Sequence, residues 1–325
     1  MTLLERDYIG QPTSVTCAAN ERRQADLSQT DPQPVFKETP MPATSESPYQ
    51  YRPVTAADIP AAHALSVHLK WPHREEDWAM VQRTSQGFVA VCEGQLVGVA
   101  FTCHQGDWSS IGLVIVSDEH QGKGIGRRLM NLCLEATAPR TPILNATELG
   151  APLYQSLGFV DFARIQQHQG IPDLSRQHTL GDGGQLRKLG SVDHPELIRL
   201  ANAGSGLDRT VVLTDLLRDA EQAVSIEHYG QLQGIALLRR FGRGHIIGPV
   251  VAQTFEQAQQ LISHLLRQIP DLFVRFDILA DCGLAPWLES LGLPCVDRAP
   301  RMVLGTPPPI STEVQQFALV TQAIG

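Results

Sequence analysis

Residues 111–136 have the sequence IGLVIVSDEHQGKGIGRRLMNLCLEA. The apolar run at its start predicts a strand, and Ile125, Leu129 and Cys133 recur at the spacing of one helix face. Between strand and helix lies a turn, QGKGIG at residues 121–126. Glycine allows successive backbone N–H groups to converge on an anion, and the next helix adds the positive end of its dipole. The stretch therefore predicts an anion-binding turn between a strand and a helix.

The charge around this turn suits a pyrophosphate. Lys123, Arg127 and Arg128 lie in the turn or directly after it. The turn is neither the dinucleotide-binding fingerprint nor a P-loop, because it lacks the GxGxxG spacing and the GK[ST] ending. Taken alone, the same residues also fit a tight surface turn that binds nothing, so the surrounding elements have to decide.

Helix and strand patterns alternate around the turn. A strand begins at Tyr49, and helical patterns follow at residues 59–69 and 75–83, with Thr55 and Asp58 forming a capping box at the helix start. GFVAVCEGQLVGVAFTC predicts a hairpin of two strands before the strand that enters the turn. After the long helix, TPILNAT predicts a strand, GAPLYQSLG a short helix and FVDFARIQ a closing strand. The predicted order is strand, two helices, three strands, helix, strand, helix, strand.

The second part of the chain repeats the first. APLYQSLGF at residues 151–159 matches APWLESLGL at 285–293, and IGLVIV at 111–116 parallels IGPVVA at 247–252. Two similar segments in the same order indicate a duplicated domain. In the second copy, however, the strand is followed directly by the helix TFEQAQQLISHLL, without a glycine-rich turn. The second copy is therefore predicted to keep the scaffold and lack the anion site.

We accordingly predict an α/β fold of the α+β type with a mixed sheet, built from two related domains in tandem. The predicted boundaries are a flexible extension at 1–48, a catalytic domain at 49–170, a linker at 171–184 and a degenerate domain at 185–325.

Composition limits the function. The chain has 325 residues, 42% hydrophobic and 18% charged, with a formal charge of −8, which argues against nucleic acid as a partner. Its start does not resemble a secretory signal, and no apolar run is long enough to span a membrane. The six cysteines form no CxxC pair, so neither a zinc site nor a disulfide framework is expected. We predict a cytoplasmic protein without a metal.

The QGKGIG turn, the strand ending in LVIVS and the downstream LNATELGAPLYQSLGF together resemble the GNAT superfamily of acyl-CoA-dependent N-acyltransferases. The resemblance covers residues 51 to about 165. It implies acetyl-CoA as co-substrate, with the turn on its pyrophosphate, Val114 and Val116 beside the pantetheine arm and Asn145 near the thiol. The cofactor-binding residues implied are Val114, Val116, Gln121, Gly122, Lys123, Gly124, Ile125, Gly126, Arg127 and Asn145.

The second domain carries a resemblance of its own. GSGLDRTVVLTDLL and the final FALVTQAIG are similar to a GNAT subgroup in which a degenerate second domain follows the catalytic one. Arg239, Arg240 and Arg243 in LLRRFGRGHII fit either anion recognition or, as we favour, a solvated hairpin tip.

Acetyl transfer to an amine needs a proton acceptor and a proton donor. An ammonium has no lone pair to attack a thioester, so a base or water chain must take its proton. Tyr154 matches the general acid of the family, although it would also fit as a packing residue. For the base, the sequence offers His104 and Asp107, with Asp118 and His73 as further candidates.

We therefore expect an N-acetyltransferase that moves an acetyl group from acetyl-CoA to a primary amine of a small metabolite by direct attack. Two alternatives remain open: a module that senses acyl-CoA without turnover, and an acetyltransferase acting on protein lysines or amino termini. The sequence identifies neither the acceptor nor the oligomeric state.

Overall fold

A computed structural model describes residues 47–176 and 184–325, and Ser47–Gly325 form one compact unit. Almost all of the predicted extension 1–48 lies outside the described residues, as does half of the predicted linker 171–184. We use "first repeat" for residues 49–170 and "second repeat" for residues 185–325, following the predicted boundaries.

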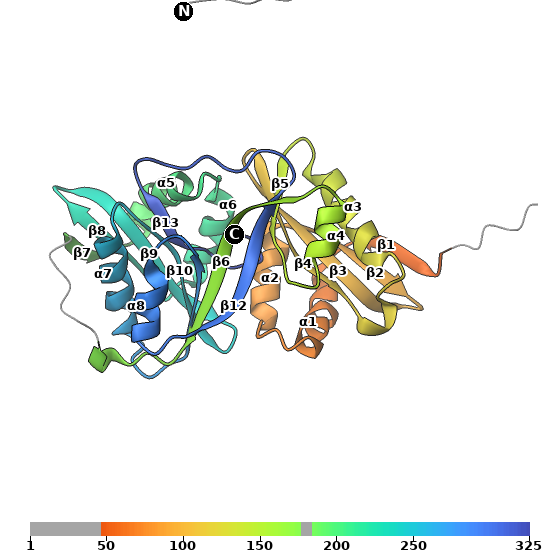
Figure 1. The fold of residues 1–325 in the computed structure, drawn as a ribbon, viewed down its shortest axis with the longest axis horizontal. Helices are drawn as coiled ribbons and strands as arrows, with labels where there is room; N and C mark the ends of the chain where they lie inside the picture. The colour runs from red at the N-terminus through yellow and green to blue at the C-terminus, as the bar shows by residue number, and fades with distance from the viewer. Residues whose placement is uncertain (1–46, 177–183) are drawn as a thin grey trace, which may run out of the picture. The chain divides into compact units, whose positions relative to one another are not determined.

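The first repeat has its elements in the predicted order (Figure 1). They are β1 (Tyr49–Pro53), α1 (Ile59–His68), α2 (Glu75–Thr84), β2 (Gln86–Cys92), β3 (Gln95–Gln105), β4 (Trp108–Val116), α3 (Ile125–Thr137), β5 (Thr141–Asn145), α4 (Ala151–Ser156) and β6 (Val160–Gly170). The predicted capping box precedes α1, where Thr55 N–H donates to Asp58 Oδ2 at 2.8 Å.

The second repeat has the same order with one extra strand. Its elements are β7 (Gln185–Lys188), α5 (His194–Ser205), α6 (Thr210–Asp219), β8 (Gln222–His228), β9 (Gln231–Phe241), β10 (Gly244–Ala252), α7 (Phe255–Leu266), β11 (Val274–Leu279), α8 (Leu284–Ser290), β12 (Cys295–Val303) and β13 (Gln315–Ala318). The segments that match in sequence lie on corresponding elements: β4 corresponds to β10, and α4 corresponds to α8. The mixed α/β fold in tandem is thus confirmed.

The two repeats share one sheet of 13 strands in the order β1-β2-β3-β4-β5-β12-β6-β11-β13-β10-β9-β8-β7. Each repeat contributes its long closing strand to the other. β12 of the second repeat pairs antiparallel with β5 of the first, and β6 of the first pairs antiparallel with β11 of the second. Figure 1 shows β6 and β12 side by side between the repeats. Neither repeat therefore completes its sheet with its own strands.

The extra strand β13 accounts for a difference between the repeats. In the first repeat, the β4–β5 pairing ends at Ile111 and Leu144, although β4 continues to Val116. In the second repeat, β13 lies between β10 and β11 and pairs with both. The first repeat therefore has an open gap between β4 and β5. The corresponding gap of the second repeat, between β10 and β11, is filled by β13.

The sheet has two distinct faces at this gap. Ile111 and Leu144 pack with α3, α4 and Tyr154 in one apolar cluster. Because successive residues of a strand point to opposite faces, Gly112 and Asn145 face the other side. A second apolar cluster on that side combines α1 and α2 of the first repeat with α5 and α6 of the second.

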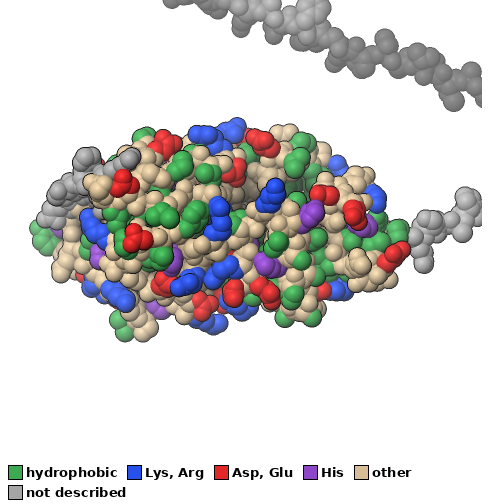
Figure 2. Space-filling view, turned by 90° about the horizontal axis from the view of Figure 1, so that it is seen from below, with side chains coloured by type: hydrophobic (Ala, Val, Ile, Leu, Met, Phe, Trp, Pro, Cys, Tyr) green, Lys and Arg blue, Asp and Glu red, His purple; other side chains and the backbone are tan. Residues whose placement is uncertain are grey.

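The surface carries both signs of charge. Figure 2 shows acidic and basic side chains interspersed over the face it displays. Among the described residues, no helix is long and apolar enough to cross a membrane.

Candidate active site

The predicted turn at 121–126 exposes backbone donors at the start of α3. Gly122 and Gly124 have φ values of 72° and 80°, the left-handed conformation that favours glycine, and Gly124 is the N-cap of α3. Within the described residues, the N–H groups of residues 122–127 donate to no acceptor. These groups, together with the helix dipole, form a site suited to a pyrophosphate.

Side chains of the turn fix its shape. Gln121 Nε2 donates to Val116 O at 3.2 Å and to Asp118 Oδ1 at 2.8 Å. Lys123 Nζ donates to Glu119 O at 2.9 Å, and Arg127 Nη2 reaches Ser156 Oγ at 2.9 Å. The predicted loop residues are thus brought together, and Arg127 ties them to the helix that carries Tyr154.

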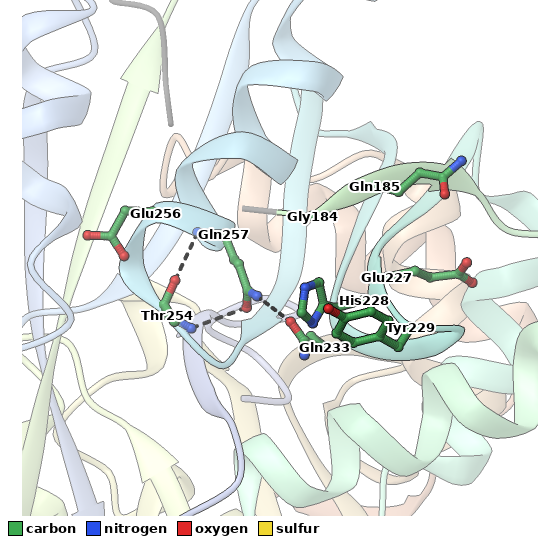
Figure 3. Close-up of a pocket in the computed structure, with 9 residues that line it drawn as sticks. All are labelled: Gly184, Gln185, Glu227, His228, Tyr229, Gln233, Thr254, Glu256 and Gln257. Atoms are coloured by element: carbon green, nitrogen blue, oxygen red, sulfur yellow. Dashed lines mark hydrogen bonds between the residues drawn. The ribbon is translucent and has the colours of Figure 1, made fainter. Parts of the chain in front are cut away.

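The corresponding helix start in the second repeat is closed by side chains (Figure 3). Thr254 Oγ1 accepts the Gln257 N–H at 3.3 Å, and Gln257 Oε1 accepts the Thr254 N–H at 3.3 Å. Gln257 Nε2 also donates to Gln233 Oε1 at 2.8 Å. A large open cavity of about 660 Å³ adjoins this helix start, and the N–H groups of residues 253, 254 and 257 there already donate to side chains of the same turn.

The open edge of β4 leads from the turn toward the strand gap. Ser117 N–H donates to Val97 O of β3 at 2.9 Å. Because neighbouring residues direct their hydrogen-bonding groups to opposite edges, Val116 points its own N–H and C=O toward the gap. Val114 lies two residues earlier, beside a register shift at Leu113, whose φ is 50°. This edge can pair with an amide-containing arm.

A small cavity lies on the opposite sheet face from Tyr154. We call it the acceptor cavity; its volume is about 130 Å³. The residues that line it are Trp71, Pro72, His73, Gly112, Leu113, Asn145, Thr147, Gln167, Arg275, Asp297, Gln322 and Ala323. Both repeats therefore contribute to its wall.

His73 lines this cavity and carries a ring nitrogen that has no hydrogen-bond partner among the described residues. This atom, Nδ1, is buried. Burial first, and then the charge of Arg275, lowers the pKa of His73 to about 4. At neutral pH the imidazole is uncharged and can accept a hydrogen bond.

The other predicted bases lie elsewhere. His104 Nδ1 is 2.7 Å from Ser109 Oγ, and Asp107 belongs to the β3–β4 turn, where its carbonyl accepts the Thr141 N–H. Asp118 is 3.3 Å from His68 Nε2 at the end of β4. None of the three lines the acceptor cavity. A basic role for His104 or Asp107 stays a prediction.

Near the gap, the side chains of Tyr154 and Asn145 lie on opposite faces of the sheet. Tyr154 is 8% exposed, and burial, followed by the neighbouring Cys133, raises its pKa to about 12. Asn145 Nδ2 donates to Gln322 O at 2.7 Å. The residue predicted to lie near the thiol end therefore contacts a segment from the far end of the chain.

That segment, residues 319–325, belongs to the final FALVTQAIG, which indicated a family resemblance but did not predict a place at the site. Gly112 leaves room for it, since a Cβ there would clash with Ala323 O. The glycine shared by IGLVIV and IGPVVA could have indicated this close approach. Gly248, which corresponds to Gly112, leaves room for Leu319 O in the same way.

A solvated hairpin tip was also wrong for Arg239, which is 4% exposed and donates to Val320 O at 2.9 Å. Arg240 and Arg243 are exposed, as that prediction requires; Arg240 pairs with Glu221 at 3.1 Å, and Arg243 lies over the Phe273 ring.

A free helix start next to an open strand edge, with a cavity near that edge, is an arrangement suited to an acyl-coenzyme A. The chain belongs to the GNAT acetyltransferase family: two profiles described as acetyltransferase (GNAT) domain match residues 67–178 and 197–318. It is 30% identical over 225 residues to the uncharacterized N-acetyltransferase YitH of Bacillus subtilis, covering 68% of this chain and 78% of that protein.

Solved structures share the tandem fold. A proposed acetyltransferase of Pyrococcus horikoshii superposes with a TM-score of 0.71 at 21% identity, over 85% of this chain and 96% of that one. A tandem GNAT protein from the clavulanic acid biosynthesis pathway gives a TM-score of 0.57 at 14% identity, over 79% and 99% of the two chains. The protein is thus a tandem N-acetyltransferase of the GNAT type, as the sequence predicted.

Proposed function

We propose that the protein transfers an acetyl group from acetyl-CoA to the primary amine of a small metabolite bound in the acceptor cavity. The size and enclosure of this cavity carry the proposal. At about 130 Å³ it is smaller than the usual range for drug-sized ligands, roughly 300–1,000 Å³. Walls from both repeats surround it, so a compact amine fits better than the lysine of a folded protein.

The residues present suit acetyl-CoA. The free N–H groups of 122–127 would hold its pyrophosphate, and the open edge of β4 at Val116 would pair with its pantetheine amides. When bound, it supplies the acetyl group as a reactive thioester. In this proposal the thioester would lie at the gap beside β4, between the Tyr154 side of the sheet and the acceptor cavity.

The reaction forms one bond and breaks one bond. The amine nitrogen attacks the thioester carbonyl, a C–N bond forms, the C–S bond breaks, and the nitrogen loses a proton. Tyr154, whose raised pKa keeps the phenol protonated, donates a proton to the departing sulfur. The proton from nitrogen passes to solvent and restores the phenol, so charge and protons balance.

We further propose that His73 orients the amine. With a pKa of about 4 the imidazole is too weak a base for an ammonium, but its free Nδ1 can accept a hydrogen bond from a neutral amine. The ammonium group of the acceptor therefore loses a proton to solvent before the neutral amine attacks the thioester. His73 stands where such a contact is needed, because it lines the cavity together with Leu113 and Asn145.

Release of free coenzyme A thiol tests the proposal. Purified protein is given acetyl-CoA and a panel of small amines, amino acids, polyamines and short lysine peptides, and the acetylated product is identified by mass. The proposal expects turnover with small amines and little with peptides. Turnover confined to lysine peptides would refute the small-metabolite acceptor, and acetyl-CoA binding without turnover of any acceptor would favour a sensor.

A further inference from the structure

Three buried arginines of the second repeat lie near the acceptor cavity without a carboxylate partner. Arg209, Arg239 and Arg301 are 1%, 4% and 7% exposed. Among the described residues none of them forms an ion pair, whereas the neighbouring Arg275 is bound to Asp277 at 2.9 Å. Buried charges in proteins are normally paired, because desolvation of a lone charge is costly. The unpaired positive charge at this interface is therefore a feature that needs a partner.

Two of these arginines are partly satisfied by the 319–325 segment. Arg209 Nη1 donates to Ile324 O at 2.7 Å, and Arg239 Nη2 donates to Val320 O at 2.9 Å. Arg209 Nη2 remains buried without a partner. Carbonyl groups satisfy donors but do not neutralise a cation.

Arg301 has the fewest hydrogen bonds of the three. In the described part of the chain its guanidinium makes no hydrogen bond and forms no ion pair; it lies 5.1 Å from the centroid of the Phe162 ring, and the Asp281 carboxylate acts on it only through the longer-range electrostatic field. Burial lowers the pKa of Arg301 to about 10, so the group keeps its charge at neutral pH. Its forked donors are free for a carboxylate, which they match in geometry.

Arg301 stands next to the reacting end of the site. It is the direct cross-strand partner of Asn145, so the two side chains lie on the same face of the sheet. Both line a narrow crevice that includes Ser110 and Gly325. This crevice shares Asn145, Gln322 and Ala323 with the acceptor cavity. Gln322 and Ala323 therefore lie between Arg301 and the acceptor cavity.

We propose that Arg301, supported by Arg209, binds a carboxylate of the acceptor, so that the acceptor is a short amino acid and not a plain amine. This inference rests on the proposed function. Directly paired residues on neighbouring strands have Cβ atoms about 5 Å apart, so only a few carbons separate the carboxylate from the amine. The carboxylate takes the place of Gln322 and Ala323 in the crevice, and those residues move aside.

Matched acceptors test the assignment. Glycine, 3-aminopropanoate and 4-aminobutanoate are compared with their primary amides, which have the same length without the negative charge. In wild type we expect kcat/KM to favour at least one acid over its amide by about tenfold or more. Arg301→Met removes the charge and should abolish that preference while turnover of the amides stays within about twofold. Arg301→Lys should retain part of the preference.

Arg298→Met provides the matched control, because Arg298 lies on the same strand with its side chain exposed. It should leave the preference unchanged. Equal use of acids and amides by wild type, or a preference that survives Arg301→Met, would overturn the assignment. A lower melting temperature of Arg301→Met with an unchanged preference would mean that Arg301 has a structural role only.

Calorimetry separates this inference from the proposed function. In the presence of coenzyme A, the acid that wild type uses best, or each acid in turn if none is used, is titrated alongside its amide. Binding of the acid that is lost in Arg301→Met supports the carboxylate site even if no acceptor is turned over. Absence of binding by every acid to wild type would contradict it.

Discussion

At the scale of single residues, the proposed chemistry depends on two side chains whose ionisation is shifted by burial. Tyr154 is kept protonated and His73 is kept neutral, because desolvation disfavours the charged form of each. They lie on opposite faces of the sheet, one with α3 and α4 and one in the acceptor cavity. In the proposed mechanism, this arrangement separates proton donation to sulfur from recognition of the amine.

Tyr154→Phe should lower kcat by about 100-fold, because general acid catalysis commonly contributes at least that factor. The KM for acetyl-CoA should change little. Among the described residues the Tyr154 ring contacts Phe159 and its hydroxyl forms no hydrogen bond, so the melting temperature should change by only a few degrees. Steady-state kinetics and a thermal melt check both points. A variant with wild-type kcat would exclude Tyr154 as the acid.

His73 makes stability depend on pH in a defined window. Its pKa is about 4 in the folded protein, against 6.5 for an unperturbed histidine, so below pH 6.5 the unfolded chain takes up a proton that the folded protein does not. Stability should fall as pH drops from 6.5 to 4, by at most about 3 kcal/mol from this residue. Urea unfolding of His73→Gln at pH 7 and pH 5 should show a smaller difference than wild type. The exposed His68→Gln serves as control, and an unchanged difference in His73→Gln would refute the assignment.

At the scale of elements, the glycine turn and α3 form the part of the site that the sequence predicted best. Local chemistry determines it: Gly122 and Gly124 adopt the left-handed conformation, and the apolar face of α3 is buried as its spacing indicates. The acceptor side was harder to predict. Arg275, Asp297, Gln322 and Ala323 reach the cavity through long-range strand pairing, which no local pattern encodes.

Gly124→Val should abolish the thermal stabilisation by coenzyme A. A β-branched residue strains the left-handed backbone at the N-cap of α3 and turns its N–H groups away from their common target. Gly230→Val is the matched control, because Gly230 has a similar φ of 76° and equally open surroundings in the second repeat. The control should lose stability and still respond to coenzyme A. Retention of the response by Gly124→Val would contradict the loop assignment.

At the scale of the whole molecule, the proposed function gives the first repeat one acetyl-CoA site and the second repeat the role of a partner domain. In the second repeat, Thr254 and Gln257 close the helix start, and β13 fills the strand gap. The partner remains necessary, since β12 pairs with β5 and the 319–325 segment lies against Gly112 and Asn145. The sequence predicted the duplication and the loss of the turn, but the exchange of β6 and β12 arises from pairing between distant segments.

The stoichiometry of acetyl-CoA binding tests this account most directly. Isothermal titration of the full chain should show one site per chain, and that site should vanish in Gly124→Val and persist in Gly230→Val. Two sites per chain, or one site that survives Gly124→Val, would place the cofactor outside the first repeat and contradict the account.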